Sequence, residues 1–332
     1  MDSLTQVVLG ATVASACVPQ EHRRKAALIG AGLGTLPDLD VLIDYGNAVA
    51  NFTLHRGFSH SLLVLIPFAA LLWYVLKRMY EPVKSAPKAW FWAITLTLVT
   101  HTLLDAHTAY GTQLFWPLDV TPTMWSTLFI IDPLYTLPLL LAFILVLTVP
   151  RSVWSKRFIT AGLILSTMYL GWSWVAKLIV YERIEQVTVS TDAEFKVFTT
   201  PTPFNTLMWR IVIVGEETYQ EGYFHFLHPD EITFNTHDIN RDLFDQSANL
   251  PSVKQLQWFA NGFNRADIID DALVITDLRM GFEDNYVFRH KVAIKAQDNW
   301  QEVSSVMLPR QLNGDDLGEF KDMFFQRKGS EN

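Results

Sequence analysis

The stretch that decides the fold is WAITLTLVTHTLLD, residues 92–105, an apolar run that ends in a histidine and an aspartate. It belongs to a hydrophobic segment of nearly the roughly 20 residues that cross a bilayer. Ionisable side chains are costly at membrane depth and are usually kept there for function. His101 and Asp105 are four residues apart, so a helix presents both on one face, where they can bind one metal ion.

Other segments in the first half of the chain are also hydrophobic. Half of the 332 residues are hydrophobic, and nearly all the long apolar runs lie in residues 1–180. Six candidate membrane segments follow from length and hydropathy: residues 3–18, 26–43, 61–77, 89–107, 132–149 and 158–180. The first is short and the second contains three glycines and Pro37, so either can be re-entrant or packed inside the bundle. We therefore predict an α-helical polytopic membrane bundle of about six segments.

Residues 181–332 have the composition of an ordinary soluble, acidic domain. Runs typical of strands cover residues 209–215, 219–227, 272–278 and 286–296, and a proline opens a predicted helix over residues 251–263. This pattern predicts a small α+β domain, mostly antiparallel, that covers the outer face of the bundle. The net charge of the whole chain is −8, which argues against a nucleic-acid partner.

Basic residues occur in alternate loops between the six segments. The loops after the first, third and fifth segments hold ten of them, and the loops after the second and fourth hold only Arg56. The ten are Arg23, Arg24, Lys25, Lys77, Arg78, Lys84, Lys88, Arg151, Lys156 and Arg157. Because basic loops face the cytoplasm, the 181–332 domain is predicted to be extracytoplasmic, and the ionisable residues gather near the outer face.

That topology brings histidines and aspartates from distant segments to one depth. The candidate metal ligands are Asp38, Asp40, His55, His60, His101 and Asp105. Imidazole and carboxylate ligands suit a divalent transition metal, zinc first, with manganese and iron as alternatives. Six candidates exceed one tetrahedral shell, so the site can hold one ion or two.

The local sequence around two of these pairs departs from regular helix. Asp38 and Asp40 are two residues apart, which puts them about 200 degrees apart on a helix, so they do not share a face. Pro37 disfavours helix at the residue before it, which permits local unwinding at the two acids. Gly57 permits a sharp turn between His55 and His60.

These residues predict hydrolytic chemistry at a membrane surface. A divalent metal lowers the pKa of a bound water, and Asp38 or Asp40 can accept the proton. Arg56 can bind an anionic phosphoryl oxygen in two-pronged fashion, or it can be a simple surface charge. The depth of the site favours a membrane lipid or another phosphoester as substrate, whereas the choice between ester and phosphoester stays open.

Two other function classes use the same residues. A transporter can relay protons or bind an ion through the histidines and aspartates, although it usually needs polar groups at the bilayer midplane. A membrane anchor with a degenerate site can present the C-terminal domain as a binding module. Asp132 also has two interpretations, because an aspartate before Pro133 is a standard helix start as well as a candidate site residue.

Several ordered motifs carry a resemblance to a known family. They are MDSLTQ (1–6), LPDLD (36–40), HRGFSHS (55–61), HTLLD (101–105), YGTQLFWP (110–117) and IDPLYTLP (131–138). Together they resemble the YdjM-like family of bacterial inner-membrane metal-dependent hydrolases over roughly the first 180 residues. The resemblance implies a membrane-embedded hydrolase of the bacterial inner membrane. The extracytoplasmic location predicted for residues 181–332 from the loop charges would then be periplasmic.

The resemblance also implies a ligand set. The ligands of that enzyme map onto Asp38, Asp40, His55, His60, His101 and Asp105. Many members of the family have a histidine after the N-terminal threonine, whereas this chain has Gln6 after Thr5. An amide is a poorer ligand for a transition metal, so the contribution of the first segment to the site is in question.

Overall fold

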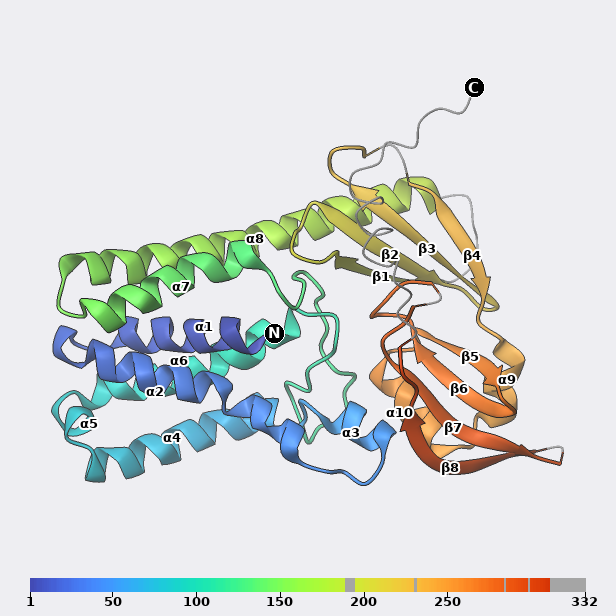
Figure 1. Cartoon of the computed structure of the whole chain (residues 1–332), viewed down its shortest axis with the longest axis horizontal. Coiled ribbons are helices and arrows are strands. Elements are labelled where there is room, and N and C mark those ends of the chain that lie inside the picture. The colour runs from blue at the N-terminus through green and yellow to red at the C-terminus, as the bar shows by residue number, and fades with distance from the viewer. Residues whose placement is uncertain (189–194, 230–231, 284, 298, 311–332) are drawn as a thin grey trace.

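The molecule has a helical bundle at one end and two β-sheets at the other (Figure 1). The computed structural model describes residues 1–188, 195–229, 232–283, 285–297 and 299–310. The helices of the bundle are α1 (Ser3–Cys17), α2 (Arg23–Thr35), α4 (Leu62–Met79), α6 (Pro87–Ala106), α7 (Pro133–Thr148) and α8 (Val153–Thr188). Shorter helical elements join them: η1 (Gln20–His22), η2 (Pro37–Leu42), α3 (Ala48–Leu54), η3 (Phe58–His60) and α5 (Glu81–Ser85).

Glycines allow α1 and α2 to pack with their backbones in contact. A Cβ atom added at Gly10 would lie 2.3 Å from the carbonyl oxygen of Gly30, and one added at Gly34 would lie 2.4 Å from that of Gln6. Only glycine fits at such close approaches, which are typical of helix pairs inside membrane bundles. This contact makes α1 and α2 an inner pair, and most residues of α1 are buried.

The expectation of six membrane spans is not supported, although each predicted segment contains a helix. Among the described residues, two helices are long and apolar enough to cross a bilayer, α4 and α8. The helices α1, α2 and α7 have 15, 13 and 16 residues. At 1.5 Å per residue they extend about 20 to 24 Å, short of the roughly 30 Å of hydrocarbon. Helix α6 has 20 residues but carries His101, Asp105 and four threonines, which lower its hydropathy.

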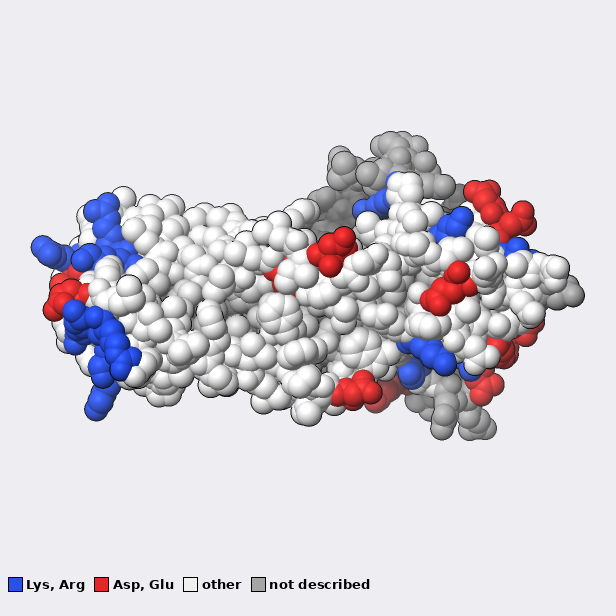
Figure 2. Space-filling model, turned by 90° about the horizontal axis from the view of Figure 1, so that it is seen from below, with Lys and Arg blue, Asp and Glu red and all other residues white. Residues whose placement is uncertain are grey.

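The ten basic residues of the alternate loops gather at one end of the bundle. Figure 2 shows Lys and Arg side chains at the end farthest from the sheets, followed by a band with almost no charge. The sheet end of the molecule carries acidic and basic side chains together. An uncharged band between a basic end and a mixed, polar end is the pattern of a protein that lies in a membrane with one preferred orientation.

The C-terminal part contains two four-stranded antiparallel sheets in simple meander order. The first sheet has β1 (Lys196–Pro201), β2 (Met208–Val214), β3 (Thr218–His225) and β4 (Phe234–Asp238). The second has β5 (Asn264–Ile269), β6 (Ala272–Asp277), β7 (Arg289–Ala296) and β8 (Asn299–Met307). Between the sheets in the chain come α9 (Arg241–Ser247) and α10 (Pro251–Phe259). The four predicted strands overlap β2, β3, β6 and β7, and the predicted helix overlaps α10.

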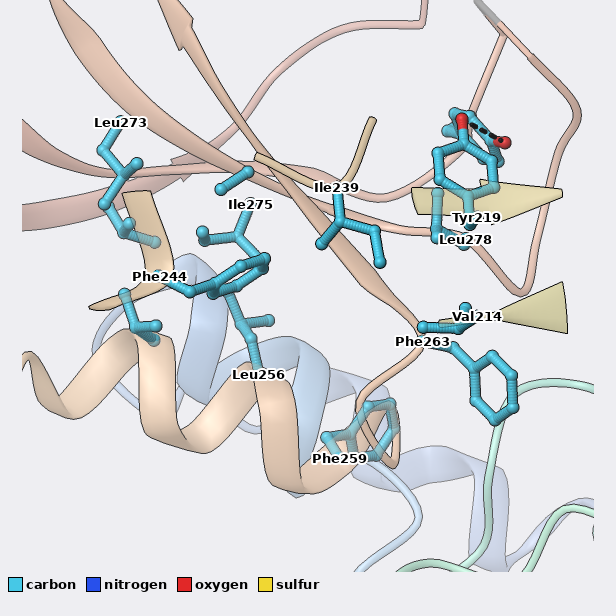
Figure 3. Packing of buried hydrophobic residues seen from close by; sticks show 14 of the residues in the cluster. Val214, Tyr219, Ile239, Phe244, Leu256, Phe259, Phe263, Leu273, Ile275 and Leu278 are labelled. Carbon is cyan, nitrogen blue, oxygen red and sulfur yellow. Dashed lines mark hydrogen bonds between the residues drawn. The ribbon is translucent and has the colours of Figure 1, made fainter. Parts of the chain in front are cut away.

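A shared core joins the sheets to helix α10. Figure 3 shows Leu256 of α10 beneath Ile275 of β6, and Phe259 of α10 and Leu273 of β6 belong to the same buried cluster. Sequence analysis placed the domain boundary at 180/181, but two elements of the first part reach into the second. Helix α8 continues to Thr188, and α3 packs two side chains into the sheet core. The ligand-bearing loop that follows α3 is therefore anchored to the C-terminal domain.

Candidate metal centre

Four side chains of the first 180 residues converge on one point near the sheet end of the bundle. Asp38, His60, His101 and Asp105 each offer one ligand atom, and these four atoms lie within 4.8 Å of one another. The Nε2 atom of His60 lies 3.2 Å from Asp105 Oδ2 and 3.4 Å from Asp38 Oδ1. Adjacent ligands of a tetrahedral zinc ion are about 3.3 Å apart when each bond is near 2.05 Å. The spacing of the four atoms therefore suits a single small divalent cation.

The segment that carries Asp38 and Asp40 departs from regular α-helix. Helix α2 ends at Thr35, and the 3₁₀ helix η2 begins at Pro37, so the predicted unwinding at the two acids is present. The tighter winding points Asp38 to the cluster and Asp40 to the neighbouring HRG loop. His101 and Asp105 lie one turn apart in α6 and reach the cluster together.

The turn between His55 and His60 uses a different residue from the one expected. Arg56 has a φ of +59°, in the left-handed region that costs energy for a residue other than glycine. Gly57 is needed for space instead, because a Cβ atom there would lie 2.8 Å from the carbonyl oxygen of Leu54. The backbone N–H of Arg56 donates to Asp40 Oδ2 at 2.8 Å, which stabilises the strained turn.

Hydrogen bonds fix the tautomers of the two histidines. His101 Nδ1 lies 2.7 Å from the carbonyl oxygen of Gly34, which can only accept, so Nδ1 carries the hydrogen. Ser59 Oγ donates to Asp40 Oδ2 at 2.6 Å and therefore accepts from His60 Nδ1 at 2.9 Å. Both Nε2 atoms are left with lone pairs, yet they face each other at 3.2 Å. Such outer hydrogen bonds typically orient metal-binding histidines.

Asp105 brings a carboxylate oxygen to the same point. One of its oxygens, Oδ1, accepts from Gln6 Nε2 at 2.8 Å and from the ammonium group of Met1. The other, Oδ2, is buried, forms an ion pair with Arg56 Nε at 3.1 Å and faces His60 Nε2 at 3.2 Å. No hydrogen bond of good geometry uses Oδ2 among the described residues, so it keeps lone pairs for a metal. Two imidazole lone pairs and this oxygen converge, so the residues fit a bound cation.

Asp40 and His55 form a second pair beside the four-atom group. His55 Nδ1 lies 2.9 Å from Asp40 Oδ1, and Asp40 Oδ2 lies 3.8 Å from His60 Nδ1. Asp40 therefore lies near the ring nitrogen of His60 that does not face the cluster, whereas His55 faces a cavity of about 210 Å³. Both residues of the pair line this cavity, together with the exposed Val41 and Leu42. The pair lies between the cluster and a surface cavity lined by both polar and apolar side chains.

Arg56 is buried against the cluster. Its Nε lies 3.1 Å from Asp105 Oδ2, its Nη1 donates to Thr108 at 3.2 Å, and its guanidinium lies over the ring of Tyr110 at 5.0 Å. With 5% of its surface exposed, it is not a simple surface charge. A fixed positive charge therefore borders the cluster.

The two acids of η2 stay ionised at neutral pH. Burial is the largest influence on the pKa of Asp38 and acts to raise it, but contacts with His101 and His60 outweigh burial and leave the pKa below its usual value. Burial also acts to raise the pKa of Asp40, and hydrogen bonds with His55 and Ser59 again produce a net lowering. An ionised carboxylate can serve as a metal ligand or as a proton acceptor.

The other candidates have structural roles. Asp132 caps α7, because its Oδ1 accepts from the backbone N–H of Leu134 at 3.0 Å and its Oδ2 accepts from the Tyr169 hydroxyl at 2.8 Å. Gln6 is completely buried, and its amide N–H groups donate to Asp105 Oδ1 and to the carbonyl oxygen of His101. Sequence reasoning missed Ser59 and the carbonyl of Gly34, although Ser59 adjoins a candidate ligand within the HRGFSHS motif.

Two known proteins are similar to parts of this chain. The chain is 29% identical over 124 residues to the uncharacterized protein YfhP of Bacillus subtilis (strain 168), covering 35% of this chain and 37% of that protein. It is 34% identical over 85 residues to the inner membrane protein YbcI of Escherichia coli (strain K12), covering 25% of this chain and 47% of that protein. The aligned parts are less than half of each relative.

Family membership rests on a longer match. No solved structure is significantly similar to the chain. The sequence profile of the YdjM inner membrane protein family matches residues 1–180, which contain the whole bundle up to the last part of α8 and all four cluster residues. That match covers more than half of the chain and indicates a membrane location. The chain belongs to the YdjM inner membrane protein family.

Proposed function

We propose that this protein is a metal-dependent hydrolase that cleaves a lipid ester or phosphoester at the outer face of the inner membrane. The observation that carries the proposal is the convergence of two imidazole lone pairs and Oδ2 of Asp105 on one buried point. A divalent transition metal, zinc first, bound there by Asp38, His60, His101 and Asp105 would lower the pKa of a coordinated water to near 7.

The chain's own residues around the cluster suit the remaining steps of hydrolysis. Asp40 orients the ring of His55 through the 2.9 Å contact, and this pair borders the cavity that opens to the surface. An aspartate–histidine pair at that place can accept a proton from water and return it to the leaving group. Arg56 lies against Asp105 and holds a positive charge beside the reacting centre, where it would stabilise an anionic phosphoryl oxygen.

A lipid substrate is favoured by what surrounds the opening. Val41 and Leu42, which line the cavity, are 69% and 80% exposed. Apolar side chains exposed next to a polar centre are typical of proteins that bind at a lipid surface. The substrate would then enter from the membrane interface, with its ester or phosphoester bond at the cluster and its chains in the bilayer.

The orientation in the membrane is part of the proposal. The ten basic residues lie at the end of the bundle farthest from the sheets, and basic loops are retained in the cytoplasm. The cluster and the C-terminal domain would then face the periplasm. A reporter fused after Asn332 should be active only outside the cytoplasm, and a cysteine introduced at Lys84 should be labelled only from inside.

The proposed activity is tested with purified protein in nanodiscs that contain lipids labelled at ester and phosphoester positions. We expect release of a labelled product that requires the metal, stops with a chelator and returns when zinc or manganese is added. The Asp40→Asn variant should keep its metal and lose most of the activity. Wild-type protein that holds metal and releases no product from any lipid would refute the hydrolase and favour the ion-transport alternative.

A further inference from the structure

A second cavity lies where the bundle meets the two sheets. It has a volume of about 200 Å³, and its walls come from the segment between α6 and α7, from the first sheet and from the segments that follow β6 and β8. Apolar side chains dominate the lining, among them Leu128, Phe129, Ile130, Met280 and Phe282. An apolar cavity at the junction of two domains is a typical site for a hydrophobic ligand.

Two of the three arginines in the wall, Arg210 and Arg279, are neutralised by carboxylates within the protein. Arg210 donates to both oxygens of Glu221, at 2.9 and 2.8 Å. Arg279 donates to Asp277 at 2.9 Å and to the carbonyl oxygen of Phe259 at 3.1 Å. Neither guanidinium needs a charge from a ligand, so the interior of the cavity selects apolar groups.

Two features connect this cavity with the lipid phase. Ile130 lies three residues before α7, whose outward residues Leu134, Leu137 and Leu141 are between 51% and 60% exposed and form an apolar face. Phe129 in the wall contacts the ring of Phe204, which is itself 55% exposed. The apolar surface of the bundle therefore continues to the cavity without a charged side chain between Ile130 and Leu141 other than the buried cap Asp132.

We propose that the cavity binds the acyl chain of an amphiphile that enters from the bilayer, with the anionic head group at Arg310. Arg310 is the exposed cation of the lining residues; it lies three residues after the end of β8, and its Nε donates to Asn285 Oδ1 at 2.5 Å, which leaves its other N–H groups for a ligand. A carboxylate or a phosphate can pair with its guanidinium. The source of the chain is therefore a free fatty acid or an anionic phospholipid.

This site is separate from the metal centre but shares a wall with it. Thr108 and Tyr110 line the cavity, and both contact Arg56 on their other side. A bound chain would thus press on the two side chains that position Arg56. The proposal does not depend on hydrolysis, because binding needs neither metal nor turnover.

The test uses the full-length protein in nanodiscs with spin-labelled stearate or spin-labelled phosphatidylglycerol. We expect an immobilised spectral component from at least one of the two probes. Ile130 and Ile131 provide a matched pair, because Ile130 lines the cavity and Ile131 is a 45% exposed neighbour outside it. Ile130→Trp should lower affinity for the probe by about tenfold or more as it excludes methylenes from the cavity. Ile131→Trp should bind as wild type does.

The outcomes of this test either identify the lipid that supplies the acyl chain or overturn the proposal. Immobilisation of stearate alone identifies a fatty acid, and immobilisation of phosphatidylglycerol identifies a bilayer lipid. If Ile130→Trp does not fold, Ala109→Phe fills the same cavity from the bundle side. Equal binding by the filled and the control variants, or no immobilised component with either probe, would overturn the proposal. Arg310→Ala should weaken binding of both anionic probes and leave a spin-labelled neutral diglyceride unaffected.

Discussion

His60 and His101 face each other across the candidate metal centre, with 3.2 Å between their Nε2 atoms. The first residue lies in η3 and the second in α6, and each has its Nδ1 hydrogen committed to an oxygen behind it. Two lone pairs at this distance repel each other unless a proton or a cation lies between them. The account assigns that place to a metal ion.

Replacing a histidine of the cluster should remove the metal, whereas replacing a histidine outside the cluster should not. His101→Ala is expected to abolish retention of zinc, because one lost ligand among four typically destroys a site. His107→Ala is the matched control, since His107 is also buried at the end of α6 but contacts Leu103 and Trp174. Metal analysis of both purified variants makes the comparison. Equal metal content in the two would place the site elsewhere.

Gln6 should affect the zinc affinity of the site without being a ligand. Its amide holds Asp105 Oδ1 at 2.8 Å, which leaves Oδ2 for the metal. Gln6→Ala is expected to weaken zinc affinity about 10- to 100-fold, as loss of an outer hydrogen bond typically does. Gln6→Glu removes the donor and adds a negative charge, so its affinity should differ from that of the alanine variant. Zinc titration with a competing chelator measures both, and unchanged affinity in Gln6→Ala would show that the contact is unimportant.

Arg56 should affect turnover rather than metal retention. Arginine has no lone pair to offer a metal, and its charge next to Asp105 opposes a bound cation. Arg56→Ala is therefore expected to hold at least as much metal as wild type and to turn over an anionic substrate more slowly. Arg56→Lys is the conservative control, since it keeps the charge and loses the planar geometry. Loss of metal in Arg56→Ala would contradict this assignment.

The C-terminal domain should lose stability in mild acid because of His290. This side chain is fully buried in β7, neither ring nitrogen has a hydrogen-bond partner among the described residues, and burial lowers its pKa to about 4. The unfolded chain binds the proton near pH 6.5, so stability is full above that pH and falls as pH decreases toward 4. The loss is about 3 kcal/mol at most.

A substitution isolates this effect. His290→Leu removes the titrating ring and leaves the contact with Phe52 apolar, so the midpoint of thermal unfolding should fall less between pH 6.5 and 4 than it does in wild type. His237→Gln is the control, because His237 is partly exposed and lies in the other sheet. The same slope of midpoint against pH in His290→Leu and wild type would rule out His290 as the cause.

Hydrophobic pattern and spacing predicted much of the fold and of the site. The six apolar segments each contain a helix, and the spacing of His101 and Asp105 placed both in one cluster. Sequence length alone overstated the number of spans, because a segment such as 26–43 continues past Pro37 into 3₁₀ geometry. Asp38 and Asp40 look equivalent in sequence. Only the winding of η2 directs Asp38 to the cluster and Asp40 to the HRG loop.

Contacts between distant parts of the chain could not be predicted from local pattern. Helix α3 is a seven-residue stretch before His55 that lies outside the long apolar segments, yet Val49 and Phe52 lie in the core of the C-terminal domain. The tautomer of His101 depends on the carbonyl oxygen of Gly34, 67 residues away. Such contacts depend on tertiary packing, for which a single sequence has no periodic signal.

The metal content of the purified protein tests the central claim most directly. Elemental analysis of wild type and of His101→Ala, each purified in detergent and dialysed against zinc at neutral pH, gives moles of metal per mole of chain. The account predicts about one tightly held divalent transition metal ion per wild-type chain and close to none in His101→Ala. A wild-type protein that binds no such metal, or a variant that binds as much as wild type, would contradict it.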